Sequence, residues 1–166
     1  DDITTLPPSV GMAGSDGRII VGADGDLGGV DFAVVGDFYN TTGFTPIDGS
    51  AATPLVGAAG EYEAWANGST VTVHNGGTFD AGGTVRDLDL GGVSSKVTMV
   101  ATVDTTDTPT GRRLMAWNPY TGQLQWQRNI PGAHSDVTTD GLRVAYRVGH
   151  TIVVRRAADG VTLRTV

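Results

Sequence analysis

WNPYTGQLQWQ, residues 117–127, predicts a β-hairpin turn that leads into a half-buried strand. Pro119 fixes the backbone at the start of the turn, and Gly122 tolerates the positive φ that ends it. After the glycine, polar and apolar residues alternate, which is the period of a strand with one buried face. We expect Leu124 and Trp126 to pack against a neighbouring sheet, while the three glutamines face the other way.

The same turn occurs four times along the chain. Its final glycine falls at residues 43, 83, 122 and 160, so the intervals are 40, 39 and 38 residues. A strand-like segment precedes each turn, another follows it, and a further strand pattern lies upstream. The paired segments are 31–39 with 44–47, 69–75 with 84–90, 112–118 with 123–130, and 150–156 with 161–166. No long window has a clear helical period.

Four-stranded antiparallel units that repeat about every 40 residues are the signature of β-propeller blades. The sequence therefore predicts an all-β chain, with one β-propeller domain over residues 1–166 and four four-stranded antiparallel blades. The expected blades are 6–47, 51–90, 94–130 and 133–166.

A propeller closes only where its first and last blades meet, and three arrangements stay open. The chain forms a four-bladed ring, or two chains form an eight-bladed ring of which each is half, or the chain is part of a larger propeller. The charge distribution favours closure. Residues 1–43 carry seven acidic side chains and one basic, and residues 123–166 carry six basic and three acidic.

Composition and charge narrow the function classes. The chain has no cysteine, so disulfides, thiolate metal sites and cysteine nucleophiles are excluded. No stretch approaches the roughly 18 consecutive apolar residues of a membrane-spanning helix. Net charge is −7, yet neither half of the chain has a dense basic stripe with interleaved aromatic residues. We therefore expect no nucleic-acid partner and no membrane span.

RRLMAWNPYTGQLQWQ, residues 112–127, resembles the repeat of PQQ-type propellers, with an apolar strand, an Asx-led turn containing Thr-Gly, and a Trp four residues after the glycine. Residues 132–166 are similar to a WD40-like repeat, with a Gly-x-His opening and an Asp-Gly turn. The specific match covers mainly residues 112–166. This resemblance implies an interaction or sensory module, often found on bacterial extracytoplasmic or secreted proteins.

The resemblance also implies that Trp126 is a structural docking residue. Trp65 and Trp117 lie in predicted strands as well, where packing between blades explains them as readily as an aromatic recognition surface does. His134, Ser135 and Asp136 are adjacent in sequence, so their side chains point in different directions and cannot form a catalytic relay. The resemblance implies a hydrogen bond within the blade for His134, and no catalytic residue is predicted.

Asp24, Asp26 and Asp31 surround a glycine-rich turn and are hard oxygen donors of the kind that Ca²⁺ prefers. They predict either a calcium site or a solvated turn, and no other cofactor is expected. Two basic pairs, Arg112 with Arg113 and Arg155 with Arg156, occupy comparable places in the third and fourth units. We expect these arginines to line one face that meets an anionic ligand, or else to balance the negative charge of the acidic first unit.

These observations favour a non-enzymatic binding or scaffold module for a protein partner or an extracellular ligand. One alternative is a metal- or cofactor-binding propeller enzyme, or part of one, with its site in the central channel. Another is a carbohydrate-binding propeller. The partners expected are a protein or extracellular ligand, a second copy that completes a ring, or the remaining blades of a larger propeller.

Overall fold

The computed structural model describes residues 10–15, 18–23, 32–37, 45–47, 55–59, 62–74, 76–93, 96–108, 110–131 and 136–166, with side chains from residue 55 onward apart from 56. These residues form sixteen strands in four four-stranded antiparallel sheets. The first sheet contains β1 (Val10–Ser15), β2 (Arg18–Ala23), β3 (Phe32–Asp37) and β4 (Thr45–Ile47), and the second contains β5 (Leu55–Ala59), β6 (Tyr62–Asn67), β7 (Thr70–Val73) and β8 (Gly77–Asp80). The third contains β9 (Thr84–Gly91), β10 (Thr98–Asp104), β11 (Arg112–Trp117) and β12 (Leu124–Asn129), and the fourth contains β13 (Val137–Thr139), β14 (Arg143–Val148), β15 (Thr151–Arg156) and β16 (Thr162–Thr165).

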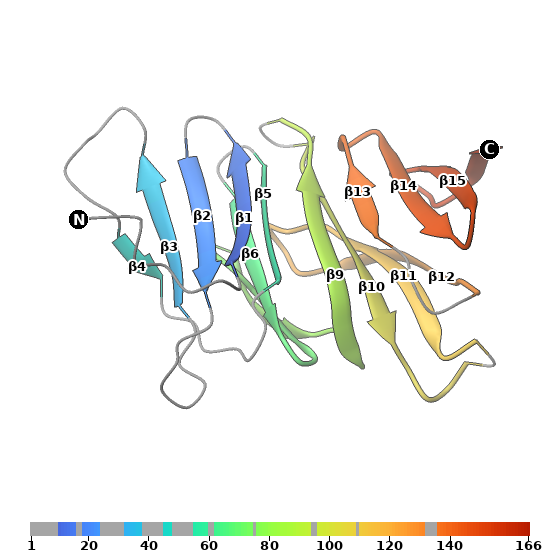
Figure 1. Ribbon diagram of the computed structural model, residues 1–166, viewed down its shortest axis with the longest axis horizontal. Helices are drawn as coiled ribbons and strands as arrows, with labels where there is room; N and C mark the ends of the chain where they lie inside the picture. Colours follow the sequence, from blue (N-terminus) through green and yellow to red (C-terminus); the bar gives the residue numbers. More distant parts are fainter. Residues whose placement is uncertain are drawn as a thin grey trace.

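Each sheet is a meander in which neighbouring strands follow one another in the chain. The first strands of successive sheets contact one another, so that β1 packs against β5, β5 against β9 and β9 against β13. The first and fourth sheets lie at opposite ends of the molecule (Figure 1). In the described part of the chain, the sheets therefore form an open series, and the first and last units do not meet within one chain.

The segment 84–90 corrects the expected division of the chain. The sequence assigned it to the end of the second unit, but it is β9, the first strand of the third sheet, and it pairs with β10. The outer strand of the second sheet is instead β8, which pairs with β7. The sequence pattern could not separate the two assignments, because a glycine turn looks alike within a sheet and between sheets.

Gly82 and Gly83 make the passage from β8 to β9. The Asp80 Oδ1 atom accepts a hydrogen bond of 2.8 Å from the Gly82 amide, and Gly82 has a φ of 73°. A side chain at Gly83 would place its Cβ 2.1 Å from the carbonyl oxygen of Asp104, the last residue of β10. Only glycine permits the backbone to approach the end of β10 this closely, and the approach starts β9 beside β10.

Apolar layers fill the two gaps on either side of the third sheet. Between the second and third sheets lie residues such as Val71, Leu88 and Met99, and between the third and fourth lie residues such as Leu114 and Val144. Both faces of the third sheet are covered, and its strand β10 is therefore buried from Thr98 to Val103.

Trp126 fixes the third sheet to the fourth. Its indole Nε1–H donates a hydrogen bond of 2.6 Å to the carbonyl oxygen of Ala157, and a Cβ added at Gly160 would lie 2.8 Å from the ring. The expectation for Leu124 is wrong, because this side chain is 41% exposed. A β-bulge is the reason: Ala116 pairs with Trp126 but Trp117 pairs with Leu124, so the simple alternation is interrupted.

Replacing Trp126 by Ala should lower the free energy of unfolding by about 3–5 kcal/mol, because it leaves a cavity between two sheets. Trp126→Phe keeps a ring but removes the donor to the buried Ala157 carbonyl, and should cost about 1–3 kcal/mol. Urea unfolding measures both changes. Gln127→Ala, at an exposed position of the same strand, serves as the control and should stay within about 0.5 kcal/mol of the parent protein. An unchanged unfolding midpoint in Trp126→Ala would contradict the docking role.

Candidate functional site

The expected calcium ligands Asp24, Asp26 and Asp31 lie outside the described residues, as does His134. The calcium site therefore stays a prediction. Within the ranges that the structure describes, no three His, Cys, Asp or Glu side chains are grouped so that they could hold a metal ion.

Arg112 and Arg113 are engaged by acidic side chains of their own sheet. Asp104 on β10 accepts a hydrogen bond of 2.7 Å from Arg112 Nε and one of 2.6 Å from Arg86 Nε, so that one carboxylate joins β9, β10 and β11. Burial opposes the ionisation of Asp104, but the two arginines lower its pKa below the usual 3.8. Arg113 Nη2 lies 2.7 Å from Asp107 Oδ2.

Arg155 and Arg156 also bond within their own sheet. Arg155 Nη1 donates to the Gly160 carbonyl at 2.8 Å, and its Nε and Nη2 atoms donate to the Tyr146 hydroxyl. Arg156 Nη1 lies 3.0 Å from Asp159 Oδ2. Adjacent residues on a strand point to opposite faces, so neither arginine pair presents both guanidinium groups on one surface.

Trp65 and Trp117 are buried in the second and third sheets. The Trp117 ring lies 5.5 Å from the ring of Phe79 on β8, with their planes tilted by 43°. Trp117 therefore contributes to the layer between these two sheets. Trp65 lies on the face of β6 opposite to Tyr62 and Ala64, because side chains alternate along a strand.

Asp87 and Asp89 on β9 make a connection to the fourth sheet that sequence reasoning missed. Asp87 Oδ2 accepts a hydrogen bond of 2.6 Å from the Val137 amide, and Asp89 Oδ2 accepts one of 2.7 Å from the Thr139 amide. These amides belong to β13, whose other edge pairs with β14. The two carboxylates thus satisfy backbone donors at an edge of β13 that pairs with no other strand among the described residues.

Burial raises the pKa of both Asp87 and Asp89 above the usual 3.8, and the backbone hydrogen bonds that they accept oppose this rise. For Asp87, the negative charges of Asp136 and Asp89 add to the increase. Two partly buried acids on neighbouring positions of one face therefore hold their protons more tightly in the folded chain than in the unfolded one.

The raised pKa of Asp89 predicts a pH-dependent contribution to stability. A group whose folded pKa lies above its unfolded value of 3.8 stabilises the fold fully below that value, and the stabilisation is lost as pH rises through the folded pKa. Asp89→Asn removes this titration. The variant should therefore show a smaller loss of unfolding free energy between pH 4 and neutrality, measured by urea unfolding at a series of pH values.

Asp140→Asn is the matched control, because its effect has the opposite sign. Hydrogen bonds from the Arg143 and Leu142 amides lower the pKa of Asp140, so its stabilisation is lost as pH falls through the folded pKa. This variant should change the free energy of unfolding at the acidic end of the pH series. If Asp89→Asn leaves the slope above pH 4 unchanged, the role of burial at Asp89 is wrong.

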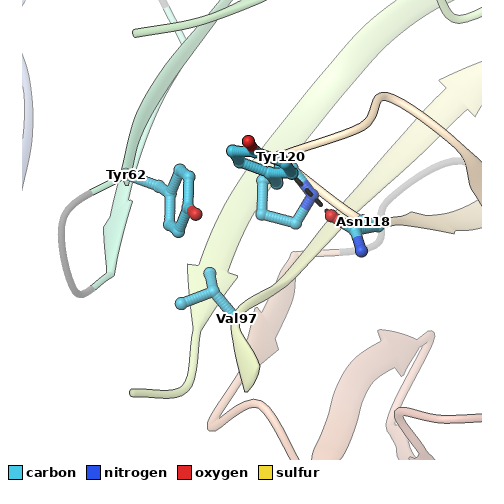
Figure 2. Close-up of a pocket in the computed structure, with 5 residues that line it drawn as sticks. Tyr62, Val97, Asn118 and Tyr120 are labelled. Atoms are coloured by element: carbon cyan, nitrogen blue, oxygen red, sulfur yellow. Dashed lines mark hydrogen bonds between the residues drawn. The ribbon is translucent and has the colours of Figure 1, made fainter. Parts of the chain in front are cut away.

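A pocket with a volume of about 270 Å³ lies between the second and third sheets. It is lined by Tyr62, Val97, Asn118, Pro119 and Tyr120. Figure 2 shows the two tyrosine rings facing one another across the pocket, with Val97 beneath them. The ring centroids are 6.5 Å apart and the planes are inclined by 77°, an edge-to-face arrangement.

Local hydrogen bonds hold the wall that carries Tyr120. Asn118 Oδ1 accepts from the amides of Tyr120 at 2.9 Å and Thr121 at 3.3 Å, and the Gly122 amide donates to the Asn118 carbonyl at 2.9 Å (Figure 2 draws the first of these). An Asx turn of this kind orders the loop from within. A Cβ added at Gly76 would lie 2.6 Å from the Pro119 carbonyl oxygen, so the turn also rests against the second sheet.

Tyr120 combines this fixed backbone with an exposed ring. Its side chain is 65% exposed, whereas Tyr62 is buried against the layer between the sheets. The sequence signalled the turn at residues 118–122 but gave no sign of the pocket, because Tyr62 is distant in sequence and reaches Tyr120 only through sheet packing.

In the part of the chain that is described, no helix is long and apolar enough to cross a membrane. No protein-family model matches the chain, and no curated protein matches it. Solved structures do match the chain. KlHsv2 with loop 6CD replaced by a Gly-Ser linker matches with a TM-score of 0.70 and 16% identity, over 97% of this chain and 55% of that one. Kluyveromyces lactis Hsv2 matches with a TM-score of 0.65 and 15% identity, over 95% of this chain and 52% of that one.

Hsv2 is a yeast β-propeller protein, and the similarity establishes a propeller-like fold for this chain. At such low identity it shows the fold alone. The chain spans about half the length of the solved structures it matches. The finer resemblance to PQQ-like and WD40-like repeats therefore stays a prediction.

Proposed function

We propose that this propeller-like chain is a non-enzymatic binding module that holds an extended segment of a protein partner at the pocket between Tyr62 and Tyr120. The observation that carries the proposal is the exposed Tyr120 ring beside a pocket of about 270 Å³. Tyrosine is enriched where proteins bind one another, because it offers a large apolar surface with one polar end.

The chemistry of the pocket walls favours an uncharged occupant. Two tyrosines, a valine and a proline supply apolar surface, and Asn118 is the one amide among the five lining residues. None of the five described lining residues is charged, so they offer no counter-charge to a phosphate or a metal ion. The volume lies near the lower end for small-molecule sites, and suits one or two side chains of a peptide better than a large cofactor.

The fixed geometry of the turn supports binding for an entropic reason. Tyr120 follows an Asx turn whose backbone is already ordered by Asn118, so little loop freedom is lost when a ligand contacts the ring. The Tyr62 ring is buried and forms the rigid opposite wall. Such an arrangement favours an apolar or aromatic side chain, or a proline, packed against the exposed Tyr120 ring at the pocket.

Selection of peptides from a phage-displayed library on the immobilised chain tests this function. We expect enrichment of peptides with aromatic or proline residues, and a loss of affinity of at least tenfold in Tyr120→Ala, because a central aromatic contact is removed. Tyr120→Phe should keep most of the affinity, since the ring stays. Leu142→Ala, which truncates a side chain that is 71% exposed just before β14 of the fourth sheet, is the control.

Circular dichroism and thermal unfolding should be the same for Tyr120→Ala and the parent protein, since the Tyr120 side chain is mostly exposed. The proposal fails if the selected peptides bind Tyr120→Ala and the parent chain with equal affinity. It also fails if the library yields no peptide that competes with the others for one site.

A further inference from the structure

The side-chain amide of Asn118 serves the turn with its oxygen and leaves its nitrogen to the pocket. The Oδ1 atom accepts hydrogen bonds from the amides of Tyr120 at 2.9 Å and Thr121 at 3.3 Å. Because both partners are donors, the atom that they meet must be the oxygen, so the turn fixes which end of the amide carries the NH₂ group. The Nδ2 atom makes no hydrogen bond to any residue that the structure describes. Asn118 lines the pocket, and its NH₂ group is therefore a donor that an occupant can use.

Three other turns of the chain are held in the same way, but by aspartate. Asp80 and Asp159 each accept at Oδ1 a hydrogen bond from the amide two residues further along, at 2.8 Å and 3.1 Å. Asp140 Oδ1 accepts from the amides two and three residues further along, at 2.8 Å and 2.6 Å, which is the pattern of Asn118. A carboxylate binds such amides at least as well as a neutral amide oxygen does. The turn alone therefore does not require the NH₂ group of Asn118.

The backbone of the same turn offers no further donor to an occupant. The amides of residues 118 and 120–122 all donate within the turn, and Pro119 has no N–H group. Both oxygen atoms of Asn118 already accept hydrogen bonds from these amides. On this wall of the pocket, the NH₂ group of Asn118 is thus left as a donor without a neighbouring acceptor among the described residues.

This arrangement selects an occupant that brings acceptors and few donors. A backbone N–H buried against the wall would lose its hydrogen bond to water without gaining another. A proline has no N–H group, but the peptide carbonyls around it remain acceptors. Its ring also suits the Tyr120 side chain, which presents a 65% exposed apolar surface at the pocket. A proline-rich segment is already extended before it binds, so it loses little conformational freedom.

We propose, on the basis of the binding function proposed above, that the occupant of this pocket is a proline-containing protein segment in the polyproline II conformation. Asn118 Nδ2 donates a hydrogen bond to one carbonyl oxygen of the segment, and a proline ring packs against Tyr120. The Tyr120 ring supplies contact area, whereas Asn118 determines which class of segment is bound. None of the five described lining residues is charged, which agrees with a neutral occupant.

Fluorescence anisotropy with fluorescein-labelled decaproline tests the proposal on the 166-residue chain. We expect saturable binding, and displacement of the label by peptides selected from the phage library. A labelled Gly-Ser peptide of the same length should not bind, because it brings an N–H group at every residue and no ring to pack against Tyr120.

Asn118→Asp isolates the donor, because it keeps the oxygen that orders the turn and replaces the NH₂ group by a second acceptor. The affinity for decaproline should fall by about tenfold or more, since a peptide carbonyl would then face a carboxylate. The melting temperature should stay that of the parent chain, because aspartate already holds the equivalent turn at Asp140. Asp140→Asn makes the reverse change in the fourth sheet, and as the matched control it should leave the affinity unchanged.

The other outcomes overturn the proposal in distinguishable ways. If Asn118→Asp binds decaproline as tightly as the parent chain does, the amide donor has no role in recognition. A lower melting temperature in this variant would contradict the equivalence of the turns. If library peptides bind through Tyr120 but decaproline does not bind, the proline-containing occupant is wrong and the binding function stands. If no peptide binds in a way that depends on Tyr120, the binding function itself fails, and this proposal with it.

Discussion

Coverage of sheet faces is the constraint on which this structure depends. A sheet with apolar side chains on both sides is stable only when another layer of structure packs on each of them, and in this chain that layer is another sheet. The third sheet meets this condition, and so β10 can be buried along most of its length. This coverage decides where the other features lie. Trp126 docks where one sheet covers the next, and the exposed arginines of the fourth sheet point outward where that coverage stops among the described residues.

Packing sheets against one another also leaves backbone amides at a strand edge without a partner strand. Side chains of β9 accept hydrogen bonds from these amides. The first strand of the fourth sheet pairs on one edge with β14, and on its other edge Asp87 and Asp89 accept its amide hydrogens. The carboxylates are partly buried in doing so, and their raised pKa values are the result. Gly91, the last residue of β9, serves the same contact from the backbone side, because a Cβ there would collide with the Thr139 carbonyl oxygen of β13.

The proposed function uses a loop at the end of a sheet, a kind of surface that such a series of sheets leaves exposed. Loops at the sheet ends are free to carry recognition residues, and the turn with Tyr120 is ordered by its own Asn118, so it can present a ring without support from a ligand.

Much of the local structure was predictable from particular residues. The alternation after Gly122 correctly predicted the strand β12, and the Pro and Gly of its turn correctly placed the hairpin. The same reasoning failed at 84–90, since a strand between two glycine turns carries no mark of the sheet it joins. It failed at Leu124 because a bulge reverses the side on which a residue lies, and the bulge depends on pairing with Trp117.

The sequence by itself determined the all-β class, the repeated antiparallel unit and the turns, because period and turn chemistry are local properties of the chain. Only the tertiary structure decided that Tyr62 meets Tyr120, that Asp87 and Asp89 bind the amides of β13, and that the predicted arginine pairs bond within their own sheets. The physical reason is distance along the chain. These contacts join residues of different strands or sheets, and no local pattern records which sheet will cover which face.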